Sequence, residues 1–132
     1  MFGPPGHLYV YFTYGMHWCA NAVTSADGVA GAVLIRALAP LRGIDLMTAA
    51  RPKARRAVDL ANGPAKACQA MGIDGTDDGI DLVAAEHGIA ILDDGVAPPS
   101  VPLVGPRIGI SVAREHPWRF SVPDEPHRSK PW

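Results

Sequence analysis

The stretch that decides the fold is HLYVYFTYGMHWCANAV, residues 7–23. It is rich in aromatic and β-branched residues, which favour strands, and a Gly-Met pair interrupts it. Two strand-forming runs on either side of a short connection that contains glycine are typical of a β-hairpin. We therefore predict two antiparallel strands joined by a tight turn at Gly15 and Met16.

Aromatic residues fall on both faces of the first of these strands. Side chains alternate between the faces of a strand, so Tyr9 and Tyr11 share one face. Phe12 and Tyr14 share the other. Aromatic residues are usually buried, so ordinary packing on both faces is one interpretation. The alternative is that an aromatic side chain at the tip enters a DNA base step while a ring on the inward face stacks on a base.

After the hairpin, residues 32–38 are apolar except for Arg36 and predict a third, mostly buried strand. Pro40 then stands where a helix could begin, and an approximately helical apolar stripe follows it. Residues 50–61 are basic and predict a partly helical segment.

Residues 62–73 carry the start and stop signals of a helix. Asn62 can cap it, Pro64 suits the first turn and Gly72 suits the end. The free N–H groups at such a start can bind a phosphate, and Lys66 could add a positive charge. An ordinary capped helix is the alternative interpretation.

The C-terminal half contains shorter elements. Residues 89–92, 107–111 and 118–122 predict short strands, and the proline-rich residues 96–106 predict an extended connection. The sequence thus predicts a single α+β domain over residues 1–132 with an antiparallel sheet. We expect it to be a monomer.

Composition allows a folded core. The chain has 132 residues, of which 48% are hydrophobic, and its 14 glycines and 13 prolines favour turns and short strands over long helices. The net charge of −1 gives no overall sign of nucleic-acid binding. Residues 51–56 carry four cations, however, while residues 74–94 are acidic, so a local basic face is compatible with the total.

Cysteine and histidine spacing gives little support to a metal site. Cys19 and Cys68 are far apart, the five histidines are dispersed, and neither type shows zinc spacing. We expect two reduced, buried thiols in a cytoplasmic protein without cofactors. The sequence has neither a secretory signal nor an apolar run long enough to cross a membrane.

Arg36 is the charged residue that the apolar run does not explain. An arginine inside such a run is unfavourable unless it is paired or reaches solvent. Two alternatives stay open: a structural salt bridge or strand end, and a buried cation that orients a water or a carboxylate. Glu86, Glu115 and Glu125 stand in polar stretches and are interpreted as solvated surface carboxylates.

Ordered blocks of this sequence resemble the alkyladenine (3-methyladenine) DNA glycosylase family. The first block is residues 6–21, and others follow in the family's order at residues 33–41, 62–70, 107–110 and 118–120. The resemblance implies a curved antiparallel sheet with a protruding β-hairpin, similar to the C-terminal domain of formyltransferases. It also implies a monofunctional enzyme without a cofactor, which flips an alkylated or deaminated purine out of double-stranded DNA. Hydrolysis of the N-glycosidic bond then leaves an abasic site.

The resemblance implies two groups of DNA-binding residues. Tyr14 matches the residue that enters the minor groove and fills the gap left by the flipped nucleotide, and Met16 lies beside it. Gly63, Pro64 and Lys66 match a helix start that contacts a phosphate.

It also implies a base pocket. Tyr11 matches an aromatic residue that stacks on the flipped base, and an electron-rich ring favours a cationic alkylated purine. Asn21 matches an amide that opposes the exocyclic groups of normal purines. Arg36 and the backbone carbonyl of Ile108 match the groups that hold the attacking water.

Two features of the family's pattern are missing. Its general base, a glutamate in a Glu-Ala-Tyr type segment, and a pocket histidine are expected upstream of Met1, so we expect an N-terminally truncated domain. Residues 124–129 match the closing Pro-x-x-Ser pattern only loosely. Loss of general acid–base catalysis would remove about two to four orders of magnitude in rate. The alternatives are therefore a catalytically inactive DNA-binding remnant and a fragment without function.

Overall fold

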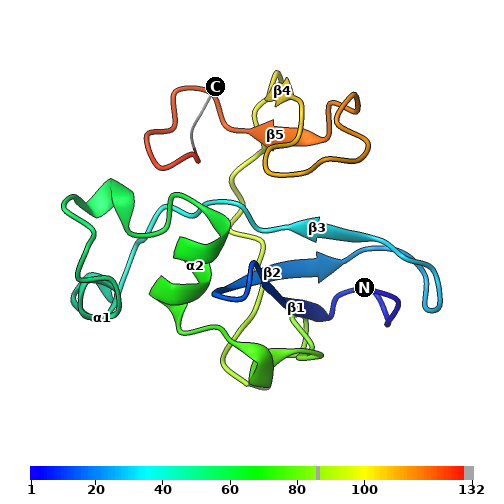
Figure 1. The fold of residues 1–132 in the computed structure, drawn as a ribbon, viewed down its shortest axis with the longest axis horizontal. Coiled ribbons are helices and arrows are strands. Elements are labelled where there is room, and N and C mark those ends of the chain that lie inside the picture. Colours follow the sequence, from blue (N-terminus) through cyan, green and yellow to red (C-terminus); the bar gives the residue numbers. More distant parts are fainter. Residues whose placement is uncertain (86, 130–132) are drawn as a thin grey trace.

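The computed structural model describes residues 1–85 and 87–129, which form two antiparallel sheets with short helices beside them (Figure 1). The first sheet has the order β1-β2-β3, and the second pairs β4 with β5. The strands are β1 (Leu8–Thr13), β2 (His17–Val23), β3 (Ala32–Leu34), β4 (Leu103–Gly105) and β5 (Arg119–Ser121). The helices are α1 (Ile44–Ala50) and α2 (Pro64–Met71), with 3₁₀ turns η1 (Ala57–Asp59) and η2 (Gly75–Asp77). The predicted α+β class with an antiparallel sheet is confirmed.

Strands β1 and β2 form the predicted hairpin, with Thr13 opposite His17. Its turn lies one residue earlier than predicted, because the N–H of Met16 donates to the carbonyl of Thr13 at 3.2 Å and makes Tyr14 and Gly15 the central residues. Both have positive φ, 53° and 66°, as hairpin turns that match the twist of the strands require. A left-handed backbone is unfavourable for a residue with a Cβ by about 1–2 kcal/mol. The turn thus holds Tyr14 at the tip at some conformational cost.

The third strand is shorter and more exposed than predicted. β3 covers only the first three residues of the apolar run, and Val33 within it is exposed. The N–H of Ile35 still donates to the carbonyl of Ala20 at 3.0 Å, but the N–H of Leu38 donates to the carbonyl of Ala61 at 3.1 Å. The prediction is wrong in its second half, because there the chain leaves the sheet and joins the segment that leads into α2.

Helix α2 begins and ends as predicted, but its cap is different. Pro64 lies in its first turn, and Gly72 ends it with a φ of 70°. Gly63 is the N-cap residue, and Asn62 lies one position too early to reach the free N–H groups. Its Oδ1 instead accepts a hydrogen bond from Nζ of Lys66 at 2.6 Å.

The segment before α2 is less helical than predicted. α1 begins only at Ile44, because Gly43 before it has a left-handed φ of 68°. Within residues 50–61, the structure is helical only at the end of α1 and in η1. Most of the apolar stripe after Pro40 is exposed, and Met47 is the member that packs against the buried alanines. These alanines are Ala61, Ala67 and Ala70.

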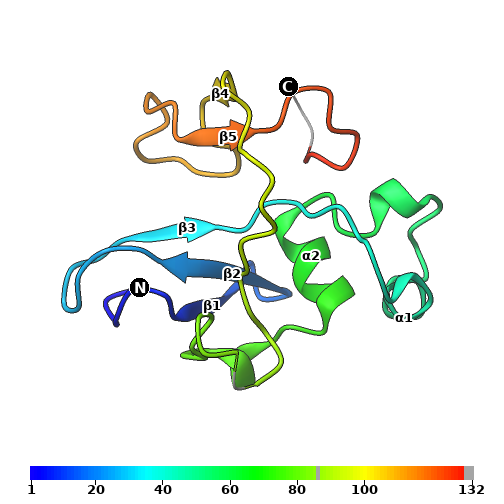
Figure 2. The same ribbon diagram turned by 180° about the vertical axis from the view of Figure 1, so that it is seen from behind.

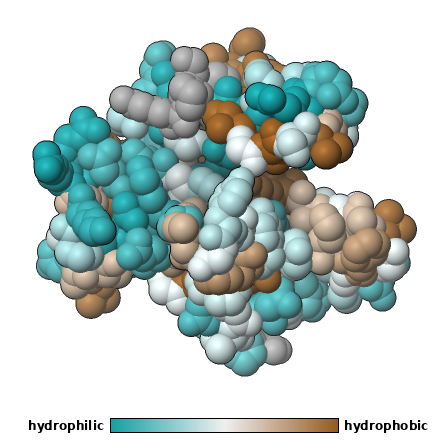
Figure 3. Space-filling view, in the orientation of Figure 1, coloured by the Kyte–Doolittle hydropathy of each residue, from teal (hydrophilic) through white to brown (hydrophobic). Residues whose placement is uncertain are grey.

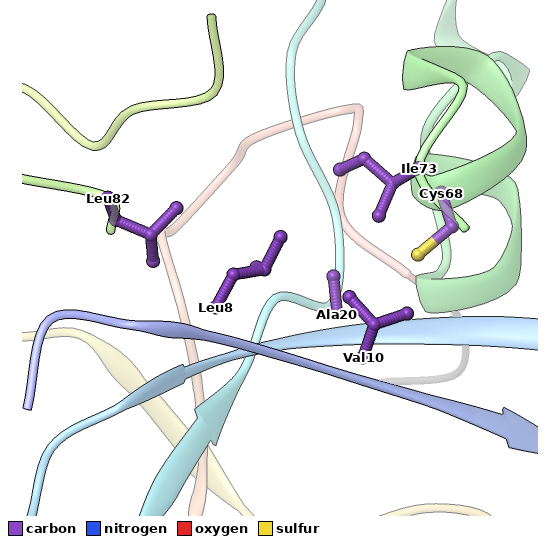
Figure 4. Packing of buried hydrophobic residues seen from close by; sticks show 6 residues of the cluster. All are labelled: Leu8, Val10, Ala20, Cys68, Ile73 and Leu82. Carbon is purple, nitrogen blue, oxygen red and sulfur yellow. The ribbon is translucent and has the colours of Figure 1, made fainter. Parts of the chain in front are cut away.

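The core lies between the first sheet and α2 (Figure 4). Its buried residues are Leu8, Val10, Ala20, Cys68, Ile73 and Leu82. Cys19 and Cys68 are both free and buried, as predicted. Because β1 turns its even-numbered side chains toward this core, Tyr9 and Tyr11 face the opposite side.

The second sheet lies beyond β3, on the side away from β1 (Figures 1 and 2). β5 confirms the strand predicted at residues 118–122, and its partner β4 falls within the predicted extended connection. The strands predicted at residues 89–92 and 107–111 are wrong. In the first, Ile91 makes only one backbone bond, to Leu82, and the second bends at Gly109, whose φ is 76°. No helix in the described part of the chain is long and apolar enough to cross a membrane.

Candidate functional site

A cavity of about 800 Å³ lies between the first sheet and the part of the chain that contains β4 and β5. Figure 3 shows the surface hollowed between these two parts. Small-molecule sites have volumes of roughly 300–1,000 Å³, so the cavity is large enough for a base. All four residues that the sequence assigns to the base pocket or to the attacking water line it: Tyr11, Asn21, Arg36 and Ile108.

Two stacked tyrosines form one wall of the cavity. The rings of Tyr9 and Tyr11 have centroids 5.5 Å apart and an interplanar angle of 26°, as their shared face on β1 predicts. Burial raises the pKa of Tyr11 to about 12, and the neighbouring Cys19 adds to the shift. The ring therefore stays neutral and electron-rich at every physiological pH, which suits stacking on a cationic base.

This shift predicts a distinct titration for Tyr11. We expect its hydroxyl to ionise near pH 12 rather than near the ordinary value of 10.0. Because the pKa is raised in the folded state, the contribution of Tyr11 to stability is complete below about pH 10 and is lost between about pH 10 and 12. Ultraviolet absorbance titrations of the wild type and Tyr11→Phe isolate this group by difference. A difference signal centred near pH 10 would contradict the prediction.

Asn21 lies in the cavity floor with a fixed orientation. The residue is buried, and its Nδ2 donates to the backbone carbonyl of Tyr9 at 3.1 Å. This bond uses the donor side of the amide and leaves Oδ1 for a group in the cavity. Asn21 can therefore offer an acceptor to a ligand that lies on Tyr11.

Arg36 is a half-buried cation at the edge of the cavity. Its Nε donates to Oγ of Ser129 at 3.2 Å, and the ion pairs found in the described residues do not include it. Burial lowers the pKa of Arg36, and the nearby positive charge of Arg119 acts in the same direction. The structure therefore gives no support to the salt-bridge interpretation and leaves a cation in contact with the cavity.

The cavity lining also includes a carboxylate that the sequence analysis interpreted as a solvated surface group and did not place there. Glu125 lines the cavity and is only partly exposed. Its Oε1 accepts hydrogen bonds from the backbone N–H of His127 at 2.9 Å and from Nδ1 of His127 at 2.6 Å. These two bonds, the backbone bond first, lower the pKa of Glu125. The residues around Glu125 are polar, and this composition did not predict that the C-terminal segment folds back onto the cavity, where Ser129 contacts Arg36.

The hairpin tip lies at the rim of this cavity. The Tyr14 side chain is 74% exposed and Met16 is 66% exposed, so neither belongs to the core. The Tyr14 hydroxyl donates to the carbonyl of Gly109 at 3.0 Å, next to the cavity-lining Ile108. On the core-facing side of β1, away from the cavity, Phe12 packs on Trp18 with centroids 4.7 Å apart. The hairpin thus combines ordinary aromatic packing at its base with an exposed aromatic ring at its tip.

The helix-start residues lie apart from the cavity. Gly63, Pro64 and Lys66 do not line it, and no side chain caps the N-terminus of α2. Lys66 is half-buried and bonded to Asn62, so its charge is held beside the uncapped end. In the described part of the chain, no group of three or more His, Cys, Asp or Glu residues could hold a metal ion.

Comparison with known proteins gives a consistent result. Residues 1–126 match the model of a family described as methylpurine-DNA glycosylase (MPG). A protein of Burkholderia lata named "Putative 3-methyladenine DNA glycosylase" is 60% identical over 131 residues, 99% of this chain and 63% of that protein. Proteins with the same name from Burkholderia cenocepacia and Mycobacterium leprae are 62% and 43% identical, and in each the match covers 59% of the relative.

The chain therefore spans about three fifths of the length of these relatives. The match to the family model covers nearly all of the chain itself and agrees with the blocks that the sequence analysis singled out. The chain belongs to the methylpurine-DNA glycosylase family.

Proposed function

We propose that this chain acts in base-excision DNA repair, as a glycosylase that removes alkylated or deaminated purines from double-stranded DNA. The observation that carries the proposal is the cavity lined by Tyr11, Asn21, Arg36 and Ile108, with an exposed tyrosine at its rim. The names of the relatives, which refer to 3-methyladenine, give the substrate class. The proposal includes the family's curved-sheet fold and a monomer as the binding unit.

Base flipping is the first step of the proposed mechanism. Extruding a nucleotide costs a few kcal/mol, and less for a damaged base whose pairing is weak. Tyr14 would fill the vacated space, which requires its hydroxyl to leave the carbonyl of Gly109. The flipped purine would stack on Tyr11, and the oriented amide of Asn21 would oppose normal purines.

Hydrolysis is the second step. The oxygen of a water molecule bonds to C1′ of the nucleotide, the N-glycosidic bond breaks, and the purine leaves with the electrons of that bond. Arg36 and the carbonyl of Ile108 would hold this water beside the sugar, because a guanidinium donates hydrogen bonds and a carbonyl accepts them. The water must also give up a proton to a base.

One observation favours the second candidate, a protein that binds damaged DNA without excision. Glu125 is the one acidic residue in the lining of the cavity as described. Two hydrogen bonds from His127 stabilise its ionised form and lower its pKa, which makes it a weak proton acceptor. A binding protein would need the cavity and the hairpin but no base.

A base-release experiment decides between the two candidates. The chain is incubated with duplex DNA that contains 3-methyladenine or hypoxanthine, and the free base is measured. Binding to a duplex with a stable abasic-site analogue is measured in parallel. Release supports the glycosylase, binding without release supports the second candidate, and the absence of both rejects the proposal.

Tyr14 gives a sharper test of flipping. Stacking of an aromatic side chain on a base contributes about 1–3 kcal/mol. We therefore expect Tyr14→Ala to weaken binding to the abasic-analogue duplex by about 5- to 150-fold, without a comparable loss on undamaged DNA. Tyr14→Phe is the matched control, since it keeps the ring and removes only the hydroxyl. Equal affinities for the wild type and Tyr14→Ala would rule out insertion of this side chain.

A further inference from the structure

The densest run of cations in the sequence lies ahead of α2, and none of these cations lines the cavity. Residues 51–66 contain five cations, Arg51, Lys53, Arg55, Arg56 and Lys66, and one carboxylate, Asp59. The chain as a whole has a net charge of −1, and five of its 12 lysines and arginines stand in this segment. Figure 3 shows a largely hydrophilic surface over the part of the molecule around η1, with apolar patches beside it in the region of α1.

Three of these cations fix the segment to its surroundings. Arg51 donates from Nη1 to Oε1 of Gln69 on α2 at 2.6 Å, and Arg56 pairs with Asp59 at 2.7 Å. Lys66 is bonded to Asn62, as described above. The segment is therefore anchored to α2 through Gln69, near the end of the helix, while Lys66 keeps one positive charge beside its uncapped start.

The other two cations are available to a partner. The side chains of Lys53 and Arg55 are exposed, and within the described ranges neither makes a hydrogen bond or an ion pair. Ala54 stands between them, and Pro52 separates Lys53 from Arg51. Residues 51–56 thus offer positive charge without a large apolar side chain of the kind that an interfacial membrane segment uses, and the exposed leucines Leu41 and Leu46 stand before them in the chain.

We propose that Lys53 and Arg55 contact backbone phosphates of the undamaged duplex that flanks the lesion, in addition to the phosphate contact that the sequence predicts for the start of α2. This inference rests on the proposed function, which supplies duplex DNA as the partner. The contacts are independent of base sequence, because phosphates carry no base identity. They serve to hold the protein on undamaged DNA and to fix its orientation at a lesion.

The test is the salt dependence of binding to an undamaged duplex. Each phosphate contact contributes about 0.9 to the slope of log affinity against log salt concentration. We expect Lys53→Gln and Arg55→Gln each to reduce the slope by about 0.9, and the double variant by about 1.8. Arg114→Gln is the matched control, since Arg114 is also exposed and its replacement changes the net charge equally. It should leave the slope unchanged.

Other outcomes overturn the inference. Slopes equal to that of the wild type in both single variants would show that these residues touch no phosphate. A loss of the same size in Arg114→Gln would show only a general effect of charge. Binding to vesicles of anionic lipid but not to the duplex would assign the surface to a membrane.

The same measurements separate this inference from the proposed function. Unchanged slopes in a chain that recognises the abasic analogue reject the phosphate contacts alone. Reduced slopes in a chain that neither recognises nor processes a lesion reject the proposed function alone.

Discussion

Replacing Leu8 by alanine is expected to lower the free energy of unfolding by about 2–5 kcal/mol, the range for leucine-to-alanine changes in protein cores. Leu8 is the largest side chain that is fully buried, with 2% of its surface exposed. It packs in the core cluster where β1 meets Ile73 and Leu82, which follow α2 in the chain. Removing it leaves a cavity that the rigid hairpin backbone cannot close.

Urea unfolding followed by circular dichroism measures this effect. Val33→Ala is the matched control, because Val33 is a strand residue with 59% of its surface exposed, and exposed substitutions usually change stability by about 0.5 kcal/mol or less. If Leu8→Ala were no more destabilising than Val33→Ala, the cluster around Leu8 would not be the stabilising core.

The largest effect on activity is expected at Arg36. Removal of one hydrogen-bond donor that stabilises charge at a reacting centre typically reduces the rate by about 10²–10³-fold. We expect Arg36→Met to reduce the single-turnover rate of base release by this factor, because methionine fills similar space without a charge or a donor. Arg36→Lys keeps the charge with a different donor geometry and should lose less.

Binding separates this role of Arg36 from a structural one. Tyr14 and Tyr11 are unchanged in Arg36→Met, so affinity for the abasic-analogue duplex should stay close to that of the wild type. A parallel loss of binding and release would instead assign Arg36 to the architecture of the cavity, through its bond to Ser129.

The parts of the fold that the sequence predicted are those that local rules determine. Alternation along β1 placed Tyr9 and Tyr11 on one face, and the structure stacks them at the cavity. Gly15 identified the hairpin turn, and Pro64 and Gly72 gave the two ends of α2. In each of these cases a backbone preference acts within a few residues.

The errors arose where distant segments decide the outcome. The apolar run continues beyond β3, and its composition predicts that the strand continues too. In the structure the N–H of Leu38 donates to the carbonyl of Ala61, and the run does not pair with β2 there. β4 stands in a proline-rich stretch and is a strand only because β5 pairs with it.

In the site, the sequence likewise did not predict that Glu125 lies at the cavity. It enters the cavity because Ser129, a few residues later, is bonded to Arg36. The contacts between Leu38 and Ala61, between β4 and β5, and between Arg36 and Ser129 join distant segments, so no periodic pattern in the sequence predicts them.

The most direct test of the account is a structure of the chain bound to a duplex that contains one alkylated purine. The account predicts that the purine lies in the cavity against the ring of Tyr11, and that the Tyr14 ring occupies its former place in the duplex. The Tyr14 hydroxyl would then have left the carbonyl of Gly109. A purine still stacked within the duplex, with the Tyr14–Gly109 hydrogen bond intact, would contradict it.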